Sequence, residues 1–250
     1  MTFVHLEVRE GLATVRLERG KVNALNEQVV DELSRCFRDL EADPAVRGIL
    51  FTGTGKFFSF GFDIPEFLGV PKEEFRRYLR KFTTLYRELF FHSRPVVAAL
   101  NGHAVAGGCM LATACDARVM VKDNAKIGLN EIGFGSSLFA GSLEALRFCI
   151  GERRAQEVVY GGVLYGAEQA QSLGLIDAAV DGATLVEEAR RRLDPLVAKS
   201  PRAFRSIKRL LRQPVVEEMQ RREEASIQEF VDVWYSDETR AELAKIQIRG

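Results

Sequence analysis

Short apolar runs and longer amphipathic runs alternate over the first two thirds of the chain. Apolar and polar residues alternate in residues 4–8 and again in residues 13–17, with Glu10-Gly11 between them, which predicts a β-hairpin. Apolar residues at helical spacing in residues 29–40 predict a helix, for which Asn26 is the expected N-cap. Further buried strands are predicted within residues 46–53, 95–102 and 117–123, and further helices over about 71–91 and 106–116. This order predicts an α/β fold.

The last third of the chain has a different pattern. From about Leu185 onward, charged helical segments follow one another without a strand, and breaks are expected at Pro195, Pro201 and Pro214. We therefore divide the chain into an α/β core, residues 1–195, and a helical C-terminal region, residues 196–250. This region is expected either to pack on the core or to make oligomer contacts.

Composition narrows the function classes. The 250 residues are 46% hydrophobic, enough for a sizeable core, and 35 basic residues balance 35 acidic ones. No net field therefore favours nucleic acid or an anionic membrane. The four cysteines form no CxxC pair and the three histidines are scattered, so we expect no metal site and no disulfide framework. With no export signal and no membrane span predicted, a cytoplasmic protein is expected.

Two glycine-rich segments follow predicted strands. In TGTGKFFSFG, Gly55-Lys56 is followed by Phe57 instead of Ser or Thr, so the segment is not a phosphate-binding P-loop. A turn through Gly61 could instead leave the N–H of Phe62 facing a cavity. In AVAGGCM, the N–H of Gly107 would lie in the first turn of a helix, where it has no partner in the helix. Two such donors aimed at one oxygen form an oxyanion hole; the alternative is that the glycines only permit tight packing.

One carboxylate stands in an apolar setting. In IGLNEIGFG, Glu131 lies among glycines and apolar residues such as Ile127, Leu129, Ile132 and Phe134. Such surroundings are expected to raise the pKa of its carboxyl and suit it to proton transfer. The alternative is a glutamate that caps a loop or pairs with an arginine.

Four motifs in this order resemble the crotonase superfamily of enoyl-CoA hydratases and isomerases: KFFSFGFDI, NGHAVAGGCMLATACDARV, AKIGLNEIGFG and YGAEQAQSLGLIDAAV. The resemblance implies a spiral of ββα units with a helical C-terminal trimerisation region. It also implies a homotrimer or dimer of trimers acting on an acyl-CoA thioester, with coenzyme A present only as part of the substrate and no prosthetic group. By motif match, Glu131 is the catalytic glutamate, and the N–H groups of Phe62 and Gly107 hold the thioester carbonyl.

The reaction depends on a second position. Hydratases of the family carry another glutamate where this chain has Met110, and a thioether cannot activate water. One glutamate suffices to move a proton from carbon 2 to carbon 4, so we favour a 3-enoyl-CoA to 2-enoyl-CoA isomerase. An enoyl-CoA hydratase, an acyl-CoA hydrolase and a non-catalytic acyl-CoA-binding protein remain alternatives. Asp63 or Glu66 could supply a second acid, although Asp63 is also a candidate helix N-cap.

Further substrate contacts are expected from the acyl and coenzyme A parts of the ligand. Phe67, Phe134 and Phe139 are candidates for an acyl pocket, with aromatic core packing as the alternative. Lys56 is a candidate for a phosphate of coenzyme A, and Ala24 lies in a KVNALN loop that resembles the adenine-contacting loop of the family.

Overall fold

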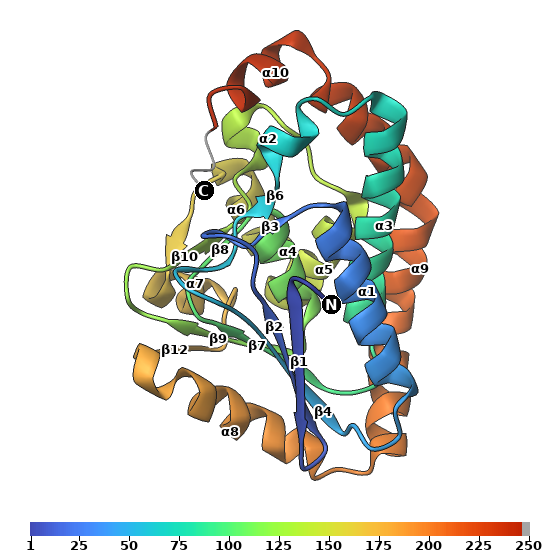
Figure 1. Cartoon of the computed structure of the whole chain (residues 1–250), viewed down its shortest axis with the longest axis vertical. Coiled ribbons are helices and arrows are strands. Elements are labelled where there is room, and N and C mark those ends of the chain that lie inside the picture. The colour runs from blue at the N-terminus through green and yellow to red at the C-terminus, as the bar shows by residue number, and fades with distance from the viewer. Residues whose placement is uncertain (247–250) are drawn as a thin grey trace.

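A six-stranded sheet forms the centre of the computed structural model, which describes residues 1–246 (Figure 1). Its strand order is β1-β2-β4-β7-β9-β12. Its strands are β1 (Val4–Arg9), β2 (Leu12–Leu17), β4 (Gly48–Gly53), β7 (Val96–Leu100), β9 (Ala117–Val121) and β12 (Ala178–Val180). β1 and β2 form the predicted antiparallel hairpin, and every other neighbouring pair in this sheet is parallel.

Two smaller sheets lie beside the large one. The four-stranded sheet has the order β11-β10-β8-β5, and β3 pairs with β6. These strands are β3 (Ala24–Leu25), β5 (Phe57–Ser59), β6 (Gly61–Phe62), β8 (His103–Val105), β10 (Lys126–Gly128) and β11 (Tyr165–Gly166). The chain passes three times from a strand of the large sheet to a strand of the four-stranded sheet and then into a helix: β4–β5, β7–β8 and β9–β10. The expected ββα repetition is therefore present.

The helices of the core bury one face each or are buried completely. They are α1 (Glu27–Ala42), α2 (Ile64–Phe67), α3 (Lys72–Phe90), α4 (Gly107–Ala114), α5 (Ala140–Ile150), α6 (Glu152–Gly161) and α7 (Ala167–Leu173), with 3-10 turns η1 (Glu131–Phe134) and η2 (Gly182–Thr184). The side chain of Asn26 caps α1 by accepting from the N–H of Val29, as predicted. Every residue of α4 is buried, which places this small-residue helix inside the molecule.

The C-terminal region consists of α8 (Leu185–Val197), α9 (Pro201–Trp234) and α10 (Asp237–Leu243). Pro201 begins α9, as predicted, but the breaks expected at Pro195 and Pro214 are wrong because both prolines lie inside helices. Pro195 falls in the last turn of α8. Pro214 leaves the carbonyl of Leu210 without its helical donor, and Leu210 is 75% exposed, so water can replace that bond. The predicted boundary at residue 195 falls within α8, and residues 247–250 of the predicted helical region lie outside the described residues.

The helices of this region pack on the core. α8 contacts β4, β7 and β9 and covers the large sheet, and α9 runs beside α3 and α5 (Figure 1). A Cβ on Gly48 of β4 would lie only 2.6 Å from the side chain of Val197, so glycine permits this close approach of α8.

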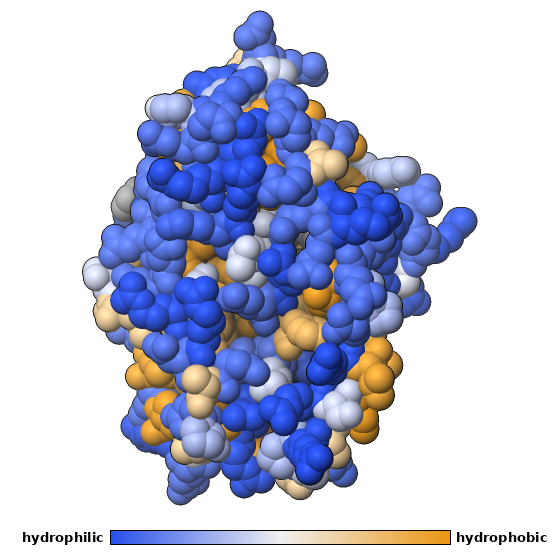
Figure 2. Space-filling model, turned by 90° about the vertical axis from the view of Figure 1, so that its right-hand side faces the viewer, coloured by the Kyte–Doolittle hydropathy of each residue, from blue (hydrophilic) through white to orange (hydrophobic). Residues whose placement is uncertain are grey.

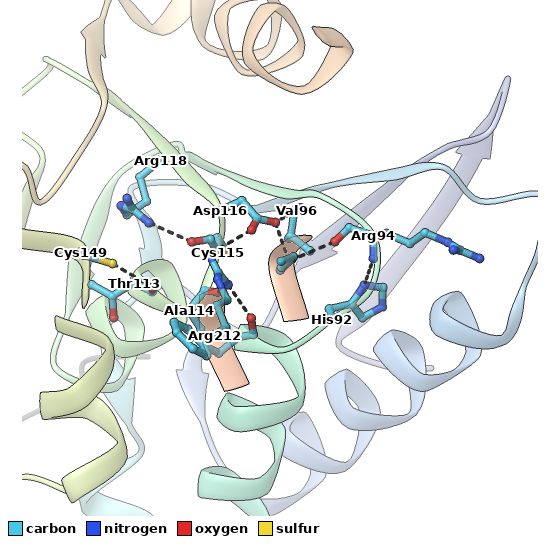
Figure 3. Close-up of polar contacts among 12 residues, drawn as sticks. His92, Arg94, Val96, Thr113, Ala114, Cys115, Asp116, Arg118, Cys149 and Arg212 are labelled. Carbon is cyan, nitrogen blue, oxygen red and sulfur yellow. Dashed lines mark hydrogen bonds and ion pairs between the residues drawn. The ribbon is translucent and has the colours of Figure 1, made fainter. Parts of the chain in front are cut away.

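A buried polar cluster fastens α9 to the core (Figure 3). Asp116, in the turn between α4 and β9, accepts from the N–H of Val96 at 2.7 Å and from Nζ of Lys208 at 2.7 Å. Its second oxygen lies 2.9 Å from Nη2 of Arg212, and Nη1 of the same side chain donates to the carbonyl of Ala114. Burial lowers the pKa of Lys208 and Asp116 opposes that shift. Lys208 and Arg212 of α9 are therefore both buried beside the carboxylate of Asp116.

The face that carries α9 is mainly hydrophilic but has hydrophobic side chains gathered on it (Figure 2). Ile207, Leu210 and Leu211 of α9 are 59%, 75% and 62% exposed. Residues at this spacing share one face of a helix. α9 therefore buries one side against α3 and α5 and leaves an apolar stripe outside.

Candidate active site

A cavity of about 50 Å³ lies between the N-terminus of α4, the 3-10 turn η1 and the end of α9. It is lined by Phe60, Phe62, Ile64, Val105, Ala106, Gly107, Met110, Asn130, Glu131, Phe134, Ser136, Phe230, Trp234 and Ile246. The predicted glutamate, both predicted oxyanion donors, Met110 and Phe134 therefore surround one space, although they come from three separate segments of the chain.

Glu131 is the first residue of η1, which follows β10 after two residues. The residue is 4% exposed, and its Oε2 has no hydrogen-bond partner among residues 1–246. Burial raises the pKa of the Glu131 carboxyl to about 8. A carboxylate with this pKa is a much stronger base than one in water, and the described residues place no cation on the cavity wall to neutralise it.

The surroundings of Glu131 differ in one respect from those expected. Ile127 and Leu129 are buried and Phe134 lines the cavity, but Ile132 is 54% exposed. The 3-10 turn directs Ile132 outward, where its side chain lies over Gly162. Met110 from α4 and the aromatic residues of α9 supply apolar walls instead.

The turn that carries Glu131 is held in place by α10. The N–H of Ser136 donates to the carbonyl of Glu131 at 2.9 Å, and Gly135 between them has a φ of +74°. The hydroxyl of Thr239 donates to the carbonyl of Gly135 at 2.6 Å, and Thr239 is 2% exposed. Sequence reasoning missed this contact, since nothing in the local sequence links a threonine in a charged helix to a loop 104 residues earlier.

Gly107 lines the cavity and has an N–H group that α4 does not use. It is the first residue of α4, and the first turn closes with the N–H of Met110 donating to the carbonyl of Ala106. The N–H of Gly107 therefore has no acceptor within α4, and the positive end of the helix dipole adds to its strength as a donor. Ala106 itself has a φ of +49°, an unfavourable value for a residue with a Cβ. The backbone is strained where it presents this donor.

The N–H of Phe62 points away from its neighbouring strand. Leu25 is paired with Phe62 in a parallel ladder, and the N–H of Asp63 donates to the carbonyl of Leu25. In a parallel ladder one partner bonds to the residues on either side of the other, so Phe62 directs its own N–H away from β3. A Cβ on Gly61 would lie 2.9 Å from the N atom of Gly107, which brings the two backbone segments into direct contact.

The glycines in these segments also serve packing. A Cβ on Gly108 would lie 2.3 Å from the carbonyl oxygen of Ser59, whereas one on Gly107 would meet nothing closer than 3.3 Å. The packing interpretation therefore holds for Gly61 and Gly108. At Gly107 a Cβ would be less crowded than at Gly61 or Gly108, so packing requires glycine there less strictly.

The two other candidate acids lie outside the cavity wall. Asp63 caps α2 by accepting from the N–H of Glu66, as the N-cap alternative predicted. Arg19 lies 2.6 Å from the carboxylate of Asp63 and 3.1 Å from that of Glu66. The sequence did not indicate Arg19, whose guanidinium forms ion pairs with both carboxylates. Among the lining residues in the described part of the chain, Glu131 is the only carboxylate, and Met110 stands on α4 where a second one would be needed.

The remaining predicted contacts lie away from this cavity. Ala24 is buried in the β3–β6 pair, and Lys56 lines a separate surface depression together with His103. Phe67 packs with its ring centroid 4.2 Å from that of Tyr78, so it belongs to the aromatic core. Phe139 stacks on Phe230 at 4.4 Å and lines a smaller neighbouring cavity of about 10 Å³. The roles of these four residues in substrate binding stay predictions.

The cavity wall also contains residues that the sequence did not single out. Phe230 and Trp234 of α9 close one side, and Asn130 and Ser136 flank Glu131 in sequence. The sequence predicted only charged helical segments in this region, with no indication of which residues face the cavity. Within residues 1–246, no group of three or more His, Cys, Asp or Glu side chains is placed to hold a metal ion, and no helix there has the length and apolar character needed to cross a membrane.

Known proteins are similar to this chain in both sequence and fold. A "Probable enoyl-CoA hydratase" of Bacillus subtilis (strain 168) is 33% identical over 214 residues, covering 84% of this chain and 82% of that protein. "Enoyl-CoA delta isomerase 1, mitochondrial" of Mus musculus is 29% identical over 96% of this chain and 84% of its own length. Human mitochondrial delta3-delta2-enoyl-CoA isomerase superposes with a TM-score of 0.92 at 26% identity, covering 96% of this chain and 95% of that one.

Solved structures of proteins named as hydratases have this fold as well as those named as isomerases. An enoyl-CoA hydratase from Bacillus halodurans superposes with a TM-score of 0.90 at 24% identity over 98% of this chain, which confirms the predicted crotonase-like α/β fold. The family model described as Enoyl-CoA hydratase/isomerase matches residues 7–245. The chain therefore belongs to the enoyl-CoA hydratase/isomerase family, the enzymes of the crotonase superfamily that its motifs resemble.

Proposed function

We propose that this enzyme converts 3-enoyl-CoA thioesters to 2-enoyl-CoA thioesters, with Glu131 as its single acid–base group. The observation that carries the proposal is the composition of the cavity wall: one carboxylate, two backbone donors and Met110 in place of a second acid. Isomerisation needs one group that removes a proton and returns it elsewhere. Hydration needs an additional group to activate water.

The chemistry follows from the positions of these groups. The N–H groups of Phe62 and Gly107 hold the thioester oxygen, so that negative charge can develop on it. The carboxylate of Glu131 removes a proton from carbon 2, and the electron pair delocalises over carbons 2 to 4 and the oxygen. The protonated Glu131 then gives the proton to carbon 4, which leaves the double bond between carbons 2 and 3. No water enters and the carboxylate is regenerated.

The raised pKa of Glu131 supports both halves of this cycle. With a pKa of about 8, the carboxylate is basic enough to accept a proton from an activated carbon, and the acid form is stable enough to hold it until transfer. Removing one oxyanion-hole donor costs about 3–4 kcal/mol of activation free energy in other enzymes, so the two backbone donors are a large part of the expected rate.

Hydration of 2-enoyl-CoA is the second candidate, because several relatives, including the one from Bacillus subtilis, are named as hydratases. It requires a water-activating group that residues 1–246 do not place on the cavity wall beside Glu131. An acyl-CoA hydrolase has the same requirement. A non-catalytic acyl-CoA-binding protein would need no base at all, and the raised pKa of Glu131 argues against it.

The test compares Glu131→Gln with the wild type. The amide keeps the size of the side chain but cannot accept the proton, so conjugation of 3-hexenoyl-CoA should disappear while binding of the thioester persists. Conjugation is measured through the absorbance of the conjugated enoyl thioester, and binding is measured by titration calorimetry. Unchanged turnover in the variant would show that Glu131 is not the base.

We also propose a homotrimer or a dimer of trimers in the cytoplasm. The exposed stripe formed by Ile207, Leu210 and Leu211 supports contacts between subunits, because apolar side chains this exposed favour burial in an interface. No prosthetic group enters the proposed chemistry; coenzyme A takes part only as the handle of the substrate. Sedimentation analysis of the purified chain measures the oligomeric state.

A further inference from the structure

Buried polar atoms without a partner gather around the cavity. Among residues 1–246, eight buried side-chain nitrogen or oxygen atoms have no hydrogen-bond partner, and four of them belong to cavity-lining residues: Asn130, Glu131, Ser136 and Trp234. Folded proteins leave few such atoms, and each calls for an explanation. Glu131 is explained by its role as the base. The other three take no part in the proposed reaction.

Two of the three unexplained atoms, Oγ of Ser136 and Nε1 of Trp234, can donate to an acceptor, and the third, Oδ1 of Asn130, is itself an acceptor. Nε1–H of Trp234 can only donate a hydrogen bond, the hydroxyl of Ser136 can donate or accept, and the amide of Asn130 can do either after a half-turn. Ser136 is tied to Glu131 through its backbone N–H, and Trp234 is fixed by stacking on Phe230, with ring centroids 5.7 Å apart. These groups are therefore held in the wall and are not free to find partners elsewhere.

The ligand group that would satisfy them is a neutral oxygen. No Lys, Arg or His lines this cavity within the described residues, so a carboxylate or phosphate placed beside Glu131 would meet a like charge without a compensating cation. A carbonyl or hydroxyl oxygen accepts from Trp234 and Ser136 without adding charge. The volume of about 50 Å³ suits a short chain, since it is well below the roughly 150 Å³ of an engineered cavity that holds benzene.

We propose that Ser136, Trp234 and Asn130 form a second polar subsite, which binds a carbonyl or hydroxyl oxygen carried by a short acyl chain beyond the thioester. The subsite rests on the proposed function in one respect: its ligand is a coenzyme A thioester. It goes further by assigning an oxygenated acyl group to the pocket. Sites built to hydrogen-bond a substrate oxygen discriminate strongly against the analogue that lacks it, because their buried groups are then left unpaired.

The test measures binding of saturated thioesters, which cannot undergo the isomerisation. Dissociation constants are determined by calorimetry for pentanoyl-CoA with its 3-oxo and 4-oxo derivatives, and for hexanoyl-CoA with its 5-oxo derivative. We expect at least one oxo derivative to bind about tenfold tighter than its parent chain, corresponding to one or two donors satisfied. Ser136→Ala and Trp234→Phe should each reduce this preference, taken as the ratio of the dissociation constants of the parent chain and the oxo derivative for the same variant.

Tyr86→Phe is the matched control, since the hydroxyl of Tyr86 is also buried without a partner but does not line this cavity. It should keep the full preference. Two results would overturn the subsite and leave the proposed isomerase intact. One is that the wild type binds all oxo and parent thioesters with equal affinity. The other is that the preference for an oxo derivative survives in both Ser136→Ala and Trp234→Phe. Failure of every thioester to bind would overturn the subsite and the proposed function together.

Discussion

Glu131→Gln is expected to stabilise the protein above neutral pH while it abolishes activity. The pKa of the Glu131 carboxyl is about 8 in the folded protein and 4.5 in its unperturbed state. Between these two values the folded protein holds a proton that the unfolded chain has released. The free energy of unfolding therefore falls as the pH rises from 4.5 to about 8, and the loss is complete above that range.

The size of the effect follows from the width of this interval. Each pKa unit corresponds to about 1.4 kcal/mol, so the interval from 4.5 to about 8 gives an upper limit of about 5 kcal/mol. Glutamine has nearly the same shape and carries no charge at any pH, so its stability has no such slope. The variant should match the wild type near pH 5 and exceed it by several kcal/mol at pH 9.

Urea unfolding at pH 5 and pH 9 measures this difference, and Glu32→Gln is the matched control. Glu32 is also buried, but although burial raises the pKa of its carboxyl, hydrogen bonds from backbone N–H groups such as those of Phe3 and Val4 lower it on balance. The stability that the Glu32 carboxylate contributes is present above the pKa of this group in the unfolded chain. It is lost as the pH falls through the lower pKa of the group in the folded protein. Glu32→Gln should therefore destabilise the protein at pH 9. If Glu131→Gln is no more stable than the wild type at pH 9, the claim that the Glu131 carboxylate is buried without a compensating partner is refuted.

Three further changes test the neighbouring parts of the account. Met110→Glu should raise hydration of 2-hexenoyl-CoA by about tenfold or more, because it supplies a second acid–base group; no gain in water addition would count against that role. Thr239→Val should lower kcat about tenfold with little change in KM, because it removes the hydrogen bond to Gly135 that holds the Glu131 turn. Thr239→Ser keeps the hydroxyl and should retain the wild-type kcat. An equal loss of kcat in both variants would contradict the positioning role of Thr239. Asp116→Ala should cost about 3–5 kcal/mol in urea unfolding by leaving Lys208 buried without its partner, and an effect below about 1 kcal/mol would show that the cluster is dispensable.

Local periodicity predicted much of the fold. The hairpin at residues 4–17, the helix capped by Asn26 and the buried helix that begins at Gly107 depend on side-chain spacing and capping, which neighbouring residues determine. The prolines show where local rules fail. Pro214 is tolerated within α9 because Arg212 and Val216 on either side are buried against the core, and no local pattern reveals such anchors.

The candidate site divides in the same way. Glu131, Phe62 and Gly107 were named from motifs, and the structure places all three on one cavity. The rest of the wall depends on contacts between segments far apart in the sequence. Trp234 reaches the cavity because α9 packs beside α3 and α5, and Arg19 pairs with Asp63 although 44 residues separate them in the sequence. Neither distance is encoded in a local pattern.

The most direct test of a single-base mechanism is the ratio of two initial rates measured with the same purified enzyme. One is the conjugation of 3-hexenoyl-CoA and the other is the addition of water to 2-hexenoyl-CoA, both followed through the absorbance of the enoyl thioester. With Glu131 as the only carboxylate that residues 1–246 place on the cavity wall, conjugation should be much faster than hydration. Hydration at a comparable or greater rate would contradict the account, because it would require a second group that activates water.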